Sequence, residues 1–141
     1  MGVTLDSLIV ENRESLTDRI VKDAIGQIPS YAEAPLRVTI ERIEQGLDAL
    51  ADSIRENDPD ILEQHLIGVA GARRREGYAI LELHAVISFY ERHLRDVVLS
   101  TCTDEVECNA LLALLDAVMG AARMVLSVRY TLIAMDQRQK T

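Results

Sequence analysis

The chain has 141 residues, which is the usual length of one domain. Hydrophobic residues make up 48% of it, enough to build one core, so a disordered chain is excluded. The net charge of −8 and the pI near 4.8 argue against binding to nucleic acids or anionic membranes, which requires clustered positive charge.

No segment looks like a leader or a membrane span. The N-terminal segment lacks the basic region and long apolar run of a secretory signal. No stretch approaches the ~18 uninterrupted apolar residues typical of a membrane helix. We therefore expect a cytoplasmic protein that does not enter a membrane, with residues 1–141 forming one all-helical domain.

The first predicted helix runs from Leu5 to Ile28, with Thr4 as its N-cap. Its inward face should carry five apolar residues, Leu5, Ile9, Leu16, Ile20 and Ala24. The segment from Pro29 to Pro35 should end it, because each proline removes a backbone donor and restrains the residue before it.

The second predicted helix has the clearest hydrophobic period in the sequence. Its apolar positions alternate at spacings of four and three, namely Leu36, Ile40, Ile43, Leu47, Leu50 and Ile54. A third helix should follow, with Asp58 as N-cap and Pro59 at its first position. It should end after the cationic run Arg73–Arg75, at Gly77.

The fourth predicted helix begins near Ala79 and closes at the segment Ser100–Thr103. Its apolar residues are Leu83, Ile87, Tyr90, Leu94 and Val97. The fifth helix should run from Asp104 to about Gln137, with Thr103 as its cap. The acidic residues near its start are favourable there, because a helix N-terminus carries partial positive charge.

The fifth predicted helix is too apolar for an ordinary surface helix. Its polar residues fall on one narrow stripe, consisting of Asn109, Asp116, Arg123, Ser127 and Thr131, with Gly120. The other residues from Ala110 to Val128 cover an arc of about 240°, whereas a surface helix needs only ~100°. Arg129 then falls at the angle of Leu111. We therefore expect a self-association seam and a C-terminal end that leaves the core.

The two flanks of this apolar arc differ in side-chain size. One is built mainly from small residues, Ala113, Ala117, Ala121, Met124 and Val128. The other is bulkier and suited to the core, with Leu112, Met119, Leu126 and Ile133. Small side chains let two helices approach closely. We therefore predict a homodimer interface at Ala117, Ala121, Met124 and Val128.

The residues with catalytic or ligand-binding chemistry form no known motif. His84 and His93 lie nine residues apart on one predicted helix and point to opposite sides, so they cannot share a metal, and His65 stands alone. Cys102 and Cys108 do not have the spacing of a zinc or redox motif. The arginine run 73–75 either binds an anion or forms a solvated helix end. We therefore predict neither an enzyme nor a metal or cofactor site.

A succession of diffuse patterns gives the chain a resemblance to a known family. They are the segments LIVENRESL (8–16), IPSYAEAPL (28–36), the Asp58-Pro59 break and ARRREGYAILELHAVISFYERHLRDVV (72–98). In this order they resemble the N-terminal domain of RsbR-type proteins, the non-haem, globin-like sensor modules of bacterial stressosome scaffolds. The resemblance covers nearly the whole chain.

The resemblance implies a globin-like bundle that dimerises through terminal helices and relays stress signals. We therefore expect a regulatory sensor or protein-interaction domain, acting on an effector domain or a kinase-type regulatory partner. The alternative is a sensor that binds haem or another tetrapyrrole through His65, His84 or His93. However, the globin pattern places the proximal histidine on a short helix, and Gly77-Tyr78 leaves no room for one. A small helical enzyme is a third alternative, without a recognisable acid–base pair.

Overall fold

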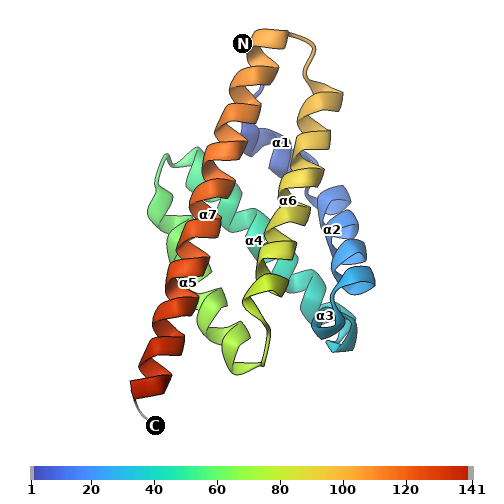
Figure 1. Ribbon diagram of the computed structural model, residues 1–141. Coiled ribbons are helices and arrows are strands. Elements are labelled where there is room, and N and C mark those ends of the chain that lie inside the picture. The colour runs from blue at the N-terminus through green and yellow to red at the C-terminus, as the bar shows by residue number, and fades with distance from the viewer. Residues whose placement is uncertain (1, 140–141) are drawn as a thin grey trace.

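The computed structural model describes residues 2–139, and within this range its regular structure consists of seven helices and no strands. The helices are α1 (Leu5–Glu11), α2 (Arg13–Gln27), α3 (Pro29–Glu33), α4 (Leu36–Arg55), α5 (Pro59–Arg75), α6 (Ile80–Thr101) and α7 (Glu105–Gln139) (Figure 1). The all-helical prediction and the long C-terminal helix are confirmed. The expected number of about five helices is wrong for the described residues, because residues 5–33 form the three helices α1, α2 and α3.

The helix expected from Leu5 to Ile28 is interrupted at Asn12. The backbone of Asn12 has φ −109° and ψ 15°, which is outside the helical range. Its side-chain Nδ2 donates to the carbonyl of Leu8 at 2.8 Å, and the backbone amide of Asn12 donates to the same carbonyl at 3.1 Å. The interruption gives two helices, and all five predicted inward residues are nevertheless buried. Where a break was expected at residues 29–35, Pro29 begins the short helix α3.

Most predicted helix ends are confirmed by their hydrogen bonds. Thr4 Oγ1 accepts from the amide of Ser7, and Asp58 accepts from the amide of Asp60 with Pro59 in the first turn. Gly77 has φ 90°, and the amide of Tyr78 donates to the carbonyl of Arg73 at 2.9 Å, which is a Schellman end. One predicted cap is wrong. The carboxylate of Asp104, rather than the hydroxyl of Thr103, accepts from the first turn of α7, at the amide of Val106.

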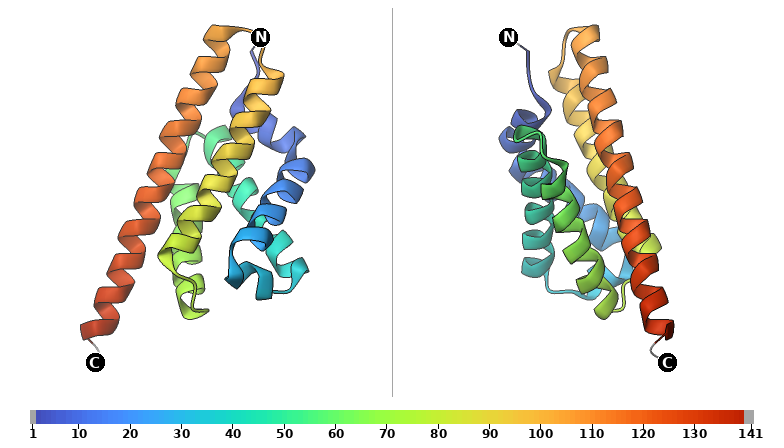
Figure 2. Two further views of the ribbon diagram at one scale, coloured as in Figure 1. Left: turned by 45° about the vertical axis from the view of Figure 1, so that its right-hand side comes forward. Right: turned by 90° about the vertical axis from the view of Figure 1, so that its left-hand side faces the viewer.

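The core lies between two groups of helices. Helices α4 and α5 lie on one side, and the antiparallel pair α6 and α7 lies on the other, with α1 and α2 along the edge (Figure 2). The largest fully buried side chains come from five of these helices, namely Leu5, Leu8, Ile9, Leu16, Ile20, Leu47, Leu50, Leu94, Val98, Leu115 and Leu126, with Thr39. Leu36, expected at the start of the α4 stripe, is 56% exposed, because Thr39 occupies the inward position of that first turn.

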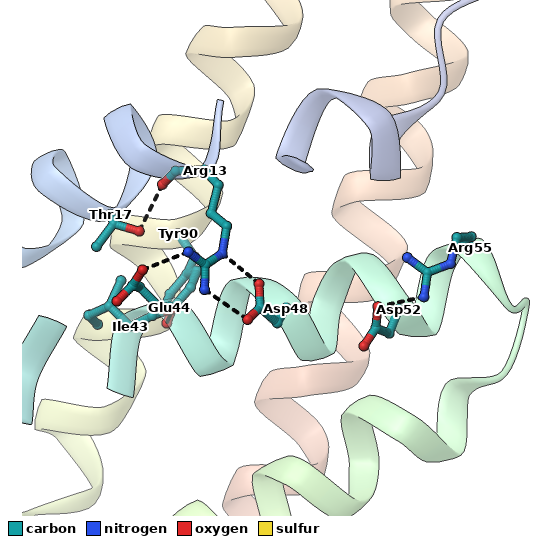
Figure 3. Close-up of polar contacts among 8 residues, drawn as sticks. All are labelled: Arg13, Thr17, Ile43, Glu44, Asp48, Asp52, Arg55 and Tyr90. Carbon is teal, nitrogen blue, oxygen red and sulfur yellow. Dashed lines mark hydrogen bonds and ion pairs between the residues drawn. The ribbon is translucent and has the colours of Figure 1, made fainter. Parts of the chain in front are cut away.

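Two polar contacts tie α4 to its neighbours (Figure 3). The guanidinium of Arg13, at the start of α2, binds Asp48 Oδ1 at 2.7 Å and Glu44 Oε2 at 2.6 Å. The hydroxyl of Tyr90 on α6 donates to the carbonyl of Ile43 at 2.9 Å. Gly46 permits this contact, because a Cβ at that position would lie 2.3 Å from the same hydroxyl. These contacts hold α4 against α2 and α6.

Candidate functional site

One face of α7 is apolar and exposed, and it carries the residues predicted for the dimer seam. Ala117 and Ala121 are exposed, Met124 is 69% exposed and Val128 is 50% exposed. The exposed face continues in both directions along the helix through Val106, Leu114, Leu132 and Met135. We call this set of exposed apolar residues, from Val106 to Met135, the α7 outer face.

The α7 outer face bears no charge along its length. At ~100° per residue its members lie within an arc of about 100°, and the charged residues of α7 fall outside that arc. The face extends over 30 residues, or about 44 Å at 1.5 Å per residue. An ordinary monomer surface carries apolar residues that are scattered singly. The α7 outer face is instead a continuous uncharged strip.

Polar contacts with α6 fix the rotation of α7 about its axis. Asp116 accepts from Arg95 at 2.6 Å, and Arg123 donates to Glu91 at 2.7 Å. One turn further, the hydroxyl of Ser127 lies 2.8 Å from His84 Nε2. These three residues belong to the polar stripe predicted from the sequence. Because the stripe is used against α6, the apolar arc is divided between the core and the outer surface.

The opposite face of α7 is buried and lines a pocket among the helices. Met119, Ala122 and Leu126 are at most 4% exposed and form one wall of a cavity of about 80 Å³. Its other walls come from α4, α5 and α6, with Tyr31 of α3. Two of these α7 residues, Met119 and Leu126, belong to the flank predicted to fill the core. A single helix therefore separates the cavity from the α7 outer face.

The end of α7 is held to the rest of the domain. Arg129 is exposed, as expected where the helix leaves the core. Beyond it, however, the hydroxyl of Tyr130 donates to the carbonyl of Tyr78, and the guanidinium of Arg74 lies 5.0 Å above the ring of Tyr130. Arg74 also donates to Gln137 Oε1 at 2.7 Å. The C-terminal end is therefore exposed on one side but does not project freely.

The three histidines are not brought together. His65 lines the cavity, His84 contacts Ser127, and His93 Nε2 lies 2.5 Å from Asp23 Oδ2. Residues 2–139 contain no group of three side chains placed to hold a metal ion. The cavity is also smaller than the ~300–1,000 Å³ of pockets for drug-sized ligands, so nothing in its size favours a tetrapyrrole.

The arginine run at the end of α5 divides into three different environments. Arg75 is exposed, Arg74 contacts α7, and Arg73 is buried at 8% exposure on the cavity wall. Of the two alternatives left open for this run, the solvated helix end is therefore wrong for Arg73. Its helical phase was a usable signal, because Arg73 lies seven residues, or two turns, after buried Leu66.

Helix α7 also has the length and composition of a membrane-spanning helix. Its most apolar window has a mean hydropathy of 1.9, and 28% of that window is buried inside the domain. One such helix is weak evidence, because long apolar helices of soluble proteins have the same composition. The exposed remainder of α7 includes the α7 outer face.

No protein-family model, curated protein or solved structure matches this chain. The α7 outer face and the cavity beneath it are the features of residues 2–139 that point to a function.

Proposed function

We propose that this domain is a cytoplasmic regulatory sensor or protein-interaction module of the globin-like class, which works as a homodimer joined through the α7 outer face. The observation that carries the proposal is the uncharged strip from Val106 to Met135 on the helix whose other face lines the cavity. An event in the cavity would reach the interface through α7 alone. An effector domain or a kinase-type regulatory partner would then read the change.

The domain exposes more surface than an average monomer of its mass. The chain exposes 8095 Å², whereas a compact monomer of 15.7 kDa exposes about 7,300 Å². This direction is expected of a domain in which one long helix, α7, is uncovered on one side.

A second copy of the chain is the partner that fits this face best. The face is long, straight and uncharged, so two copies related by a two-fold axis would bury apolar surface without opposing like charges. Ala117 and Ala121, near its middle, would allow the two α7 helices to approach closely. The overall charge of −8 disfavours an anionic membrane surface as the partner.

The mechanism would be a two-state shift of α7. The helix packs against α5 on one side and α6 on the other, so a change in the cavity volume displaces it relative to both. Shifts of ~1–2 Å at subunit interfaces are a common form of regulatory transition. A ligand biases such an equilibrium only by its difference in affinity for the two states.

The substitution Ala121→Arg tests the interface. It would place two charges at the centre of the seam, and an uncompensated buried charge costs several kcal/mol, where ~1.4 kcal/mol changes a dissociation constant tenfold. Arginine is nearly as good a helix former as alanine, so the fold should be retained. We expect multi-angle light scattering to give twice 15.7 kDa for the natural sequence and 15.7 kDa for the variant.

Ala32→Arg is the matched control, because Ala32 is exposed on α3 and carries the same change of charge. It should remain dimeric. A monomeric natural protein at high concentration, or an Ala121→Arg protein that remains a stable dimer, would contradict the interface. If the natural protein is monomeric and instead floats with neutral phosphatidylcholine vesicles, the α7 outer face is a membrane contact.

A further inference from the structure

The cavity is apolar over most of its wall, and its size limits what it can hold. Its apolar lining includes Leu50, Leu62, Val86, Met119, Ala122 and Leu126. A cavity of about 150 Å³ binds benzene, and a water molecule needs about 10–15 Å³. The 80 Å³ found here is therefore enough for a short aliphatic group, of roughly two to four carbon atoms.

One part of the wall carries two guanidinium groups that share one carboxylate. Nη1 of Arg73 lies 3.4 Å from both carboxylate oxygens of Glu76. Nη2 of Arg42 lies 3.0 Å from Oε2 of the same residue. The 3.4 Å separations are at the outer limit of a hydrogen bond, so the pairing of Arg73 is weak. Two positive charges thus face one negative charge beside an apolar space.

The other titratable groups on this wall do not balance the remaining charge. Burial lowers the pKa of His65, and the nearby charge of Arg73 lowers it further, so His65 is neutral at pH 7. Burial raises the pKa of Tyr31 and that of Tyr90, which keeps both phenols neutral. Arg73, Arg42 and Glu76 therefore carry a net charge of about +1 beside the cavity, and Arg73 is the buried member of the three.

We propose that this cavity binds a short-chain aliphatic monocarboxylate, with its carboxylate at Arg73 and Arg42 and its alkyl chain among Val86, Met119 and Ala122. A carboxylate fits a guanidinium because it accepts two parallel hydrogen bonds, and it would neutralise the unbalanced charge. The alkyl group would fill the apolar space. This inference names the signal class for the sensor proposed above and rests on it for its regulatory meaning, whereas binding itself is independent of dimerisation.

Titration of the protein with sodium butyrate tests the proposal. Binding is measured by calorimetry and by changes in the backbone amide NMR spectrum. Saturable binding should shift the resonances of residues around the cavity, including Ala122. n-Butanol has a similar apolar chain without the charge, and it should bind at least about tenfold more weakly, because hydrogen bonds to charged groups contribute ~1.5–3 kcal/mol. Octanoate should also bind more weakly, because its chain exceeds the space.

Two variants separate the charge from the space. Arg73→Met removes the charge at similar length and should weaken butyrate binding by about tenfold or more, whereas Arg75→Met, at the exposed neighbour, should leave it unchanged. Ala122→Leu fills the cavity from α7 and should abolish binding while Arg73 and Arg42 remain. If Arg73→Met does not fold, Ala122→Leu alone still decides the question.

Several results would overturn the proposal. They are equal affinity for butyrate and n-butanol, undiminished binding by the Ala122→Leu variant, or binding of chloride as tight as that of butyrate. The same titration with the Ala121→Arg protein distinguishes the two claims. If a monomeric variant binds butyrate, the proposed ligand is supported whether or not the natural protein dimerises. If the natural protein is a dimer but does not bind butyrate, only the proposed ligand is wrong.

Discussion

Asp23 on α2 is held by two side chains of α6. His93 Nε2 lies 2.5 Å from Asp23 Oδ2, and Arg92 donates to the same oxygen. Burial raises the pKa of Asp23, but the hydrogen bonds from His93 and Arg92 outweigh it, so the net pKa is lowered. A carboxylate with a lowered pKa stabilises the folded state in its ionised form.

This shift has a consequence for the dependence of stability on pH. The contribution of Asp23 is fully present above its unfolded pKa of about 3.9 and is lost as the pH falls through the lower folded value. Asp23→Asn should therefore lower the free energy of unfolding at pH 7, and the difference from the natural protein should shrink below about pH 4. Urea denaturation at several pH values measures this difference in the free energy of unfolding. A difference that grows as the pH falls below about 4 would contradict the assignment.

Arg73 belongs to a run that the sequence left open as an anion contact or a solvated helix end, and its burial on a cavity wall was not predicted. A run of three arginines before a glycine is typical of a solvated helix end, and Arg75 fits that description. The burial of Arg73 depends on α3 and α4, which supply Tyr31 and Arg42 from residues more than 30 positions away. Helical phase pointed toward the core, but the sequence contained nothing that identified a cavity there.

At the scale of elements, the end of α5 depends on a left-handed residue. Gly77 has φ 90°, and a Cβ at this position would have nothing within 4 Å, so the effect of a side chain there is confined to backbone strain. Gly68 lies inside α5, is exposed and also has open space around it. The two glycines are therefore a matched pair for the same substitution.

The two alanine substitutions should change the free energy of unfolding in opposite directions. Gly77→Ala should destabilise the domain by about 1–2 kcal/mol, because alanine is strained at positive φ. Gly68→Ala should stabilise it by about 0.5–1 kcal/mol, since alanine is the better helix former. Chemical denaturation followed by circular dichroism measures both. Stabilisation by Gly77→Ala would mean that α5 does not end in the left-handed conformation.

The sequence predicted the elements whose signals are local. Thr4, Asp58 and Gly77 mark helix ends through bonds to residues close in the chain, and all three are found where expected. The break at Asn12 was not predicted, because no proline or glycine is present and the residue is compatible with a helix. Both halves pack on the same two helices, because α1 and α2 each contact α4 and α6, and such long-range packing has no local signal in the sequence.

In the molecule as a whole, α7 contributes one face to the core and exposes the other as the α7 outer face. The division of its apolar arc followed from the sequence, because the polar stripe, the bulky flank and the small flank have distinct angles. Of the bulky flank, Met119 and Leu126 are buried as predicted, whereas Leu112 and Ile133 are only half-buried. The partner of the outer face could not be derived in the same way, because a periodic pattern identifies an apolar surface but not what covers it.

The most direct test of the α7 interface is an isotope-filtered NOE measurement on a dimer assembled from differently labelled protomers. Intermolecular NOEs are expected at the methyl groups of Ala121, Met124 and Val128. The methyl groups of Met119 and Leu126 should give none, because they lie in the core of their own protomer. Intermolecular NOEs confined to another surface, or their absence from a protein with the mass of a monomer, would contradict a dimer joined through α7.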